Sequence, residues 1–132
     1  MAFPVEEKYI ESTEQKLGVR FPDSFRSKMM ERNGGEVAVG TDSFTLHPFF
    51  DTSDKKRIKR TTSNITHETQ YARQNCRLPE SLVVIGSNGG GDTLVYQIHP
   101  DGSIDPKIYW FDHETEQIHH AADDFSDLKL LK

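Results

Sequence analysis

The chain has 132 residues, one cysteine, a hydrophobic fraction of 34% and a net charge of −5 at pH 7. A chain of this length and composition builds one modest core, so we expect a single domain over residues 1–132. It has no apolar run of the roughly 18 residues that span a membrane, and it has no basic-then-apolar leader. These features predict a cytoplasmic protein without a membrane partner. A single cysteine excludes an internal disulfide.

Two helices are predicted in the N-terminal quarter. Apolar residues recur at helical spacing from Pro4 to Leu17, and Gly18 follows where a left-handed C-terminal residue belongs. A second helix is expected to begin at Pro22 or Asp23, because proline lacks the N–H that a first turn leaves unpaired, and to end at Asn33-Gly34-Gly35. The short connection between them predicts a helical hairpin.

The middle of the chain is more polar. Short strands are expected at residues 37–39 and 44–46, and a surface loop at 51–62. The loop carries basic side chains between Lys55 and Arg60, a cluster too small for the dominant basic face of a nucleic-acid-binding protein, so no nucleic-acid partner is predicted. A third helix is expected over residues 63–75, with Ser63 as its N-cap.

Strands dominate the remaining sequence, with the strongest patterns at residues 83–85, 93–98 and 107–111. The last of these is apolar on both faces, which predicts a central position in the sheet. The turn chemistry of His99-Pro100-Asp101-Gly102 predicts an antiparallel meander. A final short helix is expected to begin at Asp124 or Ser126, so the order of helices, strands and helix indicates an α+β fold.

A glycine triplet, Gly89-Gly90-Gly91, separates two predicted strands and is followed directly by Asp92. The triplet lacks the Lys-Ser/Thr of a P-loop, and a strand rather than a helix follows it, so it is not predicted to bind phosphate. Asp92 is interpreted either as a turn cap or as a side chain presented at a cleft.

Histidines and carboxylates are the residues that could carry chemistry. His113-Glu114 and His119-His120 form the densest histidine group, but the pattern of zinc ligands on a helix is missing, so no metal or cofactor is predicted. Asp92 and Asp112 could form an acid–base pair, whereas structural carboxylates that hold turn amides are the alternative. The residues by themselves indicate a binding domain rather than an enzyme.

Several short segments occur in the order typical of one known family. They are Ile10-Glu11 with Glu14, Leu17-Gly18, Phe21-Pro22-Asp23-Ser24-Phe25, Asn33-Gly34-Gly35, Leu78-Pro79, Ile85-Gly86, Gly89-Gly90-Gly91-Asp92, Trp110 through Asp112-His113-Glu114, and Phe125 with Leu128. In this order they resemble the SUKH superfamily, which includes the Smi/Knr-type domains. The resemblance implies helices packed on one side of a curved, mainly antiparallel sheet.

The resemblance also implies a function. Most bacterial members are similar to immunity proteins, which bind and neutralise a cognate toxin of a polymorphic toxin system without catalysis. Fungal and other members are similar to regulatory or scaffold modules that bind a host protein, and this remains the alternative. A third hypothesis, a hydrolase or metal-dependent enzyme, would need Asp92, Asp112 and His113 to line a concave pocket.

The candidate partner-binding residues follow from the same resemblance. The family's shared cleft-lining positions match Gly90, Gly91, Asp92, Trp110, Asp112, His113 and Glu114. Tyr96 and Tyr109 are added because interfaces concentrate their binding energy in a few aromatic and charged anchors. The alternatives are glycines that serve a tight connection, Trp110 in the core and Asp112 as a turn cap.

Two features bear on the partner. Residues 78–132 contain 10 acidic and 3 basic side chains, which suits a basic toxin, such as a nuclease, through long-range attraction and charge complementarity. The family varies between the Asn-Gly-Gly and Leu-Pro segments, so the region that holds the basic loop is a candidate for partner specificity.

Overall fold

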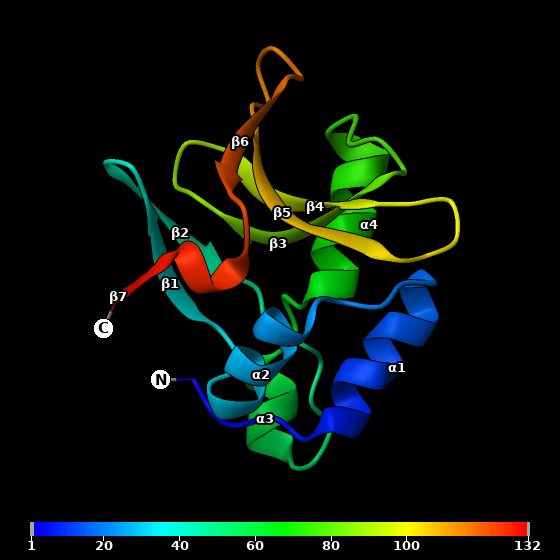
Figure 1. The fold of residues 1–132 in the computed structure, drawn as a ribbon. Helices are drawn as coiled ribbons and strands as arrows, with labels where there is room; N and C mark the ends of the chain where they lie inside the picture. Colours follow the sequence, from blue (N-terminus) through cyan, green and yellow to red (C-terminus); the bar gives the residue numbers. More distant parts are fainter. Residues whose placement is uncertain (1, 132) are drawn as a thin grey trace.

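The computed structural model describes residues 2–131, and the chain forms helices, a strand pair, two more helices and then mainly strands (Figure 1). The helices and strands are α1 Glu7–Leu17, α2 Asp23–Glu31, β1 Gly35–Val39, β2 Asp42–Leu46, α3 Lys55–Arg60, α4 Ile65–Asn75, β3 Leu82–Ser87, β4 Thr93–Ile98, β5 Ile104–Phe111, β6 Ile118–Ala122, the 3-10 helix η1 Phe125–Asp127, and β7 Lys129–Leu131. None of the helices in this part of the chain is long and apolar enough to cross a membrane.

The seven strands form one antiparallel sheet in the order β6-β5-β4-β3-β2-β1-β7. Strands β3 to β5 are the predicted meander, and β6 extends it by one strand. The pairing between β2 and β3, in the middle of the sheet, is short. Thr45 pairs with Ser87 and Leu46 with Gly86, and directly after β2 the His47 N–H donates to the Ile85 carbonyl oxygen at 2.9 Å. A Cβ atom on Gly86 would lie 2.9 Å from the Thr45 carbonyl oxygen, so glycine permits this close contact. The sheet curls into a half-barrel, which confirms the predicted α+β fold with a curved antiparallel sheet.

Helix α4 lies beside β3 along the part of the strand that does not pair with β2. The Thr69 hydroxyl accepts a hydrogen bond from the Val84 N–H at 3.0 Å. One turn later, Arg73 Nη2 donates to the Leu82 carbonyl oxygen at 3.0 Å. These two side chains satisfy backbone groups of β3 that would otherwise be buried without partners.

The core follows the alternation of side chains along the strands. On β3, Val83 and Ile85 face the main cluster, which contains Phe21, Phe25, Phe44, Phe49 and Tyr96. Leu82 and Val84 face a smaller cluster on the other side, with Ala72 of α4, Leu78, Val95 and Phe111. Because side chains alternate between the two faces of a strand, β3 and β4 are buried on both.

The structure corrects several predicted boundaries. The loop predicted at residues 51–62 contains α3, whose first turn is capped by the Asp54 carboxylate accepting from the Arg57 N–H at 2.7 Å. None of the α3 side chains is buried, so the helix has no apolar stripe by which sequence could reveal it. Its stability comes from this cap and from Phe3, whose ring lies 4.5 Å from the Arg57 guanidinium carbon.

The other corrections are at the helix ends and the C-terminus. The N-cap of α4 is Asn64 rather than Ser63, and its side chain accepts from the His67 N–H. The final helix is only the turn η1, after which the chain extends into β7 beside β1. Strand β6 was not predicted, because His119 and His120 interrupt any apolar alternation.

Candidate partner-binding site

The loop between β3 and β4 is built around the side chain of Asn88. Its Oδ1 accepts hydrogen bonds from the Gly90 and Asp92 backbone N–H groups, each at 3.0 Å. The Asn88 N–H also donates to the Asp92 carbonyl oxygen at 3.0 Å. Within the triplet only Gly91 has a positive φ, of 97°. The loop is therefore a side-chain-stabilised turn that positions Asp92, and it does not form a phosphate cradle.

Asn88 also connects this loop to the β1–β2 hairpin. Its Nδ2 donates to Asp42 Oδ2 at 2.9 Å, across 46 positions of sequence. The sequence interpretation missed both residues. The available signal was an asparagine directly before glycines, because asparagine side chains readily bond to backbone groups two residues further on.

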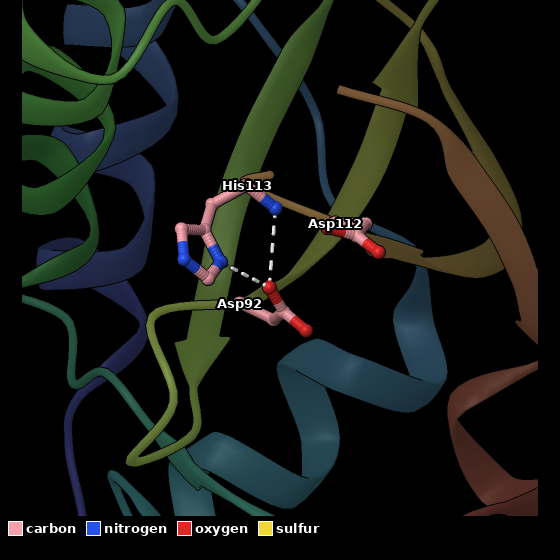
Figure 2. Close-up of side chains that lie close together, drawn as sticks. All are labelled: Asp92, Asp112 and His113. Atoms are coloured by element: carbon pink, nitrogen blue, oxygen red, sulfur yellow. Dashed lines mark hydrogen bonds and ion pairs between the residues drawn. The ribbon is translucent and has the colours of Figure 1, made fainter. Parts of the chain in front are cut away.

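Asp92 is the centre of the site, and three donors converge on it. Trp110 Nε1 donates to Oδ2 at 2.8 Å. The His113 backbone N–H donates to Oδ1 at 3.1 Å, and His113 Nδ1 lies 2.5 Å from the same oxygen. Figure 2 shows the imidazole and the backbone nitrogen of His113 both directed at this carboxylate oxygen. The hydrogen bonds join the glycine loop, the end of β5 and the turn that follows.

The charges of this pair stabilise one another. Partial burial would raise the pKa of Asp92, but hydrogen bonds from His113 and Trp110 outweigh it and hold the pKa below its ordinary value. The hydrogen bond to Asp92 raises the pKa of His113 above its ordinary value, against a smaller opposing effect of burial. The site therefore favours an ionised carboxylate beside a readily protonated imidazole.

Asp112 has a different role from Asp92. Its Oδ1 accepts from the Glu114 N–H at 2.9 Å and from the Thr115 N–H at 3.2 Å. Its backbone N–H donates to the Gln117 carbonyl oxygen at 2.9 Å, which closes the turn between β5 and β6. Asp112 is thus the turn cap that the alternative interpretation described.

The remaining predicted site residues differ in exposure. Trp110 is half-buried and packs edge-on against Phe44, with the ring centres 4.9 Å apart. Tyr109 is half-buried next to His120, whereas Gly90 and Glu114 are exposed. Tyr96 is the exception, since its side chain is completely buried in the main cluster. The prediction that Tyr96 contacts a partner is therefore wrong, because the alternation of β4 turns it toward the core.

The arrangement bears on metal binding and on acid–base chemistry. Asp92, Asp112 and His113 each bring one potential ligand atom within 4.8 Å of the others. However, both Asp92 oxygens already accept hydrogen bonds, and Asp112 Oδ1 holds two amides. The carboxylates are accounted for by the two turns that they stabilise.

Comparison with known proteins adds the family. A search of curated proteins gives no match to this chain. The family model described as SMI1 / KNR4 family (SUKH-1) matches residues 4–129, which include the helices, strands β1 to β6 and the first residue of β7. The glycine loop, Asp92 and the turn after β5 all lie inside the matched region. The chain therefore belongs to the SMI1/KNR4 (SUKH-1) family.

Proposed function

We propose that this chain is an immunity protein that binds a toxin domain one-to-one and neutralises it without catalysing a reaction. The observation that carries the proposal is the family match over residues 4–129, because SUKH domains are typical immunity proteins of polymorphic toxin systems. The candidate contact surface consists of Gly90, Gly91, Asp92, Asp112, His113 and Glu114, here called the Asp92–Glu114 region, with Trp110 and Tyr109 beside it.

The physical character of this region supports binding. Its backbone N–H groups donate hydrogen bonds to the side chains of Asn88, Asp92 and Asp112, which fixes the backbone, so little conformational entropy is lost when a partner docks. Glu114 extends from the turn with 81% of its side chain exposed. Exposed acids on a rigid turn attract a basic partner and accelerate its association.

The first experiment is co-expression of this chain with the toxic domain encoded beside its gene, scored by growth of the host cell. The proposal predicts that growth is rescued and that the two proteins co-purify as a one-to-one complex. A folded chain that neither rescues growth nor binds this domain would contradict the proposal and favour a regulatory module that binds a host protein.

A charge-reversal pair then tests the contact surface. Glu114→Lys should slow association with the toxin domain, and the effect should shrink as salt is added, because screening weakens attraction between exposed charges. Glu31→Lys at the end of α2 changes the net charge equally at another exposed position, so it is the matched control. If both variants associated with the toxin domain at the same rate, the Asp92–Glu114 region would not be part of the interface.

A further inference from the structure

The two edges of the sheet are protected differently. Edge strand β7 has three residues and begins with the exposed Lys129. Edge strand β6 has five residues, contains neither lysine nor proline, and begins with Ile118, which is 38% exposed. Short length and lysine are two of the devices by which proteins prevent unwanted strand pairing. Of these two edges, β6 is therefore the one suited to accept another strand.

The backbone of β6 has groups available for such pairing. The Asp112 N–H donates to the Gln117 carbonyl oxygen, so these two residues form a hydrogen-bonded pair. In the same register, two residues further along each strand, Trp110 lies opposite His119. Because hydrogen-bonded and non-hydrogen-bonded pairs alternate in an antiparallel ladder, His119 bonds to β5, while Ile118 and His120 direct their N–H and C=O groups outward. Within residues 2–131, β6 makes backbone hydrogen bonds with β5 alone.

The side chains next to this edge are typical of an interface. His120 lies opposite Tyr109 and Ile118 lies opposite Phe111, so these side chains share one face of the sheet. The Tyr109 and His120 rings meet edge-on, with their centres 6.2 Å apart. A half-buried tyrosine and an exposed isoleucine beside an open edge give a partner both apolar contact and backbone hydrogen bonds.

Acidic residues lie at both ends of β6. Glu114 and Glu116 precede the strand, and Asp123 follows it directly. Glu116 is paired with Arg77, and Asp123 with His120 Nε2 at 2.8 Å, but the Asp123 side chain remains 77% exposed. An extended segment flanked by lysine or arginine would place its charges opposite these acids. Pairing β6 with a second copy of this chain would instead bring acidic ends together, which opposes a homodimer.

We propose that the outer edge of β6 binds an extended, lysine- or arginine-flanked strand of a basic toxin domain, which adds to the sheet as an eighth strand. The inference rests on the proposed immunity function and names the surface and the chemistry of the partner. Main-chain hydrogen bonds at Ile118 and His120 supply affinity, and the acids at either end set the preference for a basic segment.

The test compares Ile118→Pro with Ile118→Ala in a binding measurement with the toxin domain encoded beside this gene. Both variants lose the isoleucine side chain, and only proline removes the outward N–H. Proline is tolerated as the first residue of an edge strand. We expect Ile118→Pro to bind about tenfold more weakly than Ile118→Ala, since one lost hydrogen bond at an interface is worth about 1.4 kcal/mol. Equal affinities of the two variants would overturn the inference and leave the immunity function intact.

Hydrogen exchange gives a second readout that needs no variant. In the complex, the outward amides of Ile118 and His120 should become protected, whereas the His119 amide, already bonded to β5, should change little. Unchanged exchange at Ile118 and His120 in a complex that forms would overturn the inference, including where Ile118→Pro fails to fold.

A third arm separates this inference from the proposed function. If the wild-type chain forms no complex with the toxin domain, the probe becomes the peptide Lys-Thr-Val-Thr-Val-Thr-Lys, with the same peptide carrying glutamate for lysine as the control. Protection of the Ile118 and His120 amides by the lysine peptide alone would support a basic-strand site in β6. No protection by the lysine peptide would overturn it.

Discussion

The carboxylate of Glu14 and the guanidinium of Arg26 meet inside the protein, with Arg26 Nε 3.2 Å from Glu14 Oε2 and less than a tenth of either side chain exposed. The same Glu14 oxygen accepts from the Phe21 backbone N–H at 2.8 Å. One carboxylate thereby joins α1, the connecting segment and α2. This arrangement gives a physical reason for a buried glutamate at position 14 of this chain.

Glu14→Gln should destabilise the protein strongly, because it leaves the buried Arg26 without its buried charge partner. We expect the free energy of unfolding to fall by about 3 kcal/mol, at the low end for breaking a buried pair, since Glu7 still contacts Arg26 at 2.9 Å. Urea denaturation measures the change. Glu7→Gln is the control, because the Glu7 side chain is 53% exposed and its loss should cost less than about 1 kcal/mol. Similar losses for both variants would contradict a dominant role of Glu14.

Two threonines of α4 give a matched test of the contact between this helix and β3. Thr69→Val removes the acceptor of the buried Val84 N–H, so stability should fall by about 1–3 kcal/mol. Thr66→Val removes a buried hydroxyl that has no hydrogen-bond partner among the described residues, so it should be neutral or stabilising. Thermal unfolding of both variants provides the measurement. If Thr69→Val were as stable as Thr66→Val, the Thr69 hydroxyl would contribute nothing to stability.

The three consecutive glycines should differ in their tolerance of alanine. At Gly91 the φ angle is positive, and an added Cβ would lie 3.2 Å from the His113 ring, so Gly91→Ala should cost about 1–3 kcal/mol. At Gly89 nothing lies within 4 Å of an added Cβ, and φ is not positive, so Gly89→Ala should change stability by less than about 1 kcal/mol. Chemical denaturation compares the two variants. If the order were reversed, the loop would have a different conformation in solution.

The Asp92–His113 pair should make stability depend on pH. The pKa of His113 is raised above 6.5, so its contribution is fully present below pH 6.5 and is lost as pH rises through the raised value. The pKa of Asp92 is lowered below 3.8, so its contribution is present above pH 3.8 and is lost as pH falls through the lowered value. The pair is therefore most stabilising between pH 3.8 and 6.5.

Melting temperatures of wild type and His113→Gln, measured from pH 4 to pH 9, test this dependence. Their difference should be largest near pH 5 and should shrink above pH 6.5. In an Asp92→Asn background, the same histidine substitution should lose most of this pH dependence, because its charge partner is gone. A difference that stays constant across the range would show that the two charges do not interact.

The parts of the fold that sequence predicted are those with strong local patterns. Strand β4 and the end of α1 follow from alternation and from a glycine in the left-handed conformation, and the structure has both where they were expected. The turn at His99-Pro100-Asp101-Gly102 was also predicted from its proline, aspartate and glycine. It is confirmed by hydrogen bonds from the Gly102 N–H to the His99 carbonyl oxygen and from the His99 N–H to the Ser103 carbonyl oxygen.

The missed features depend on contacts distant in sequence. Strand β7 exists because it pairs with β1, more than 90 positions earlier, and α3 is held through Phe3 near the N-terminus. In the candidate site, the resemblance brought Asp92 and His113 together, and the structure places them in contact. It missed Asn88 and Asp42, whose contact spans two hairpins, and local pattern could not show that Tyr96 faces the core.

The narrow pairing between β2 and β3 has a consequence for how the molecule opens. Because this pairing is short, we expect the strands to form two cooperative units, β3 to β6 on one side and β7-β1-β2 on the other, which meet at the β2–β3 seam. Local opening between β2 and β3 costs less free energy than separating two strands within one unit. The candidate site takes Asp92 and His113 from the first unit and reaches the second through the contact between Asn88 and Asp42. A partner that binds both units would hold them together. Local unfolding at the contact between β2 and β3 should then slow more on complex formation than elsewhere in the molecule.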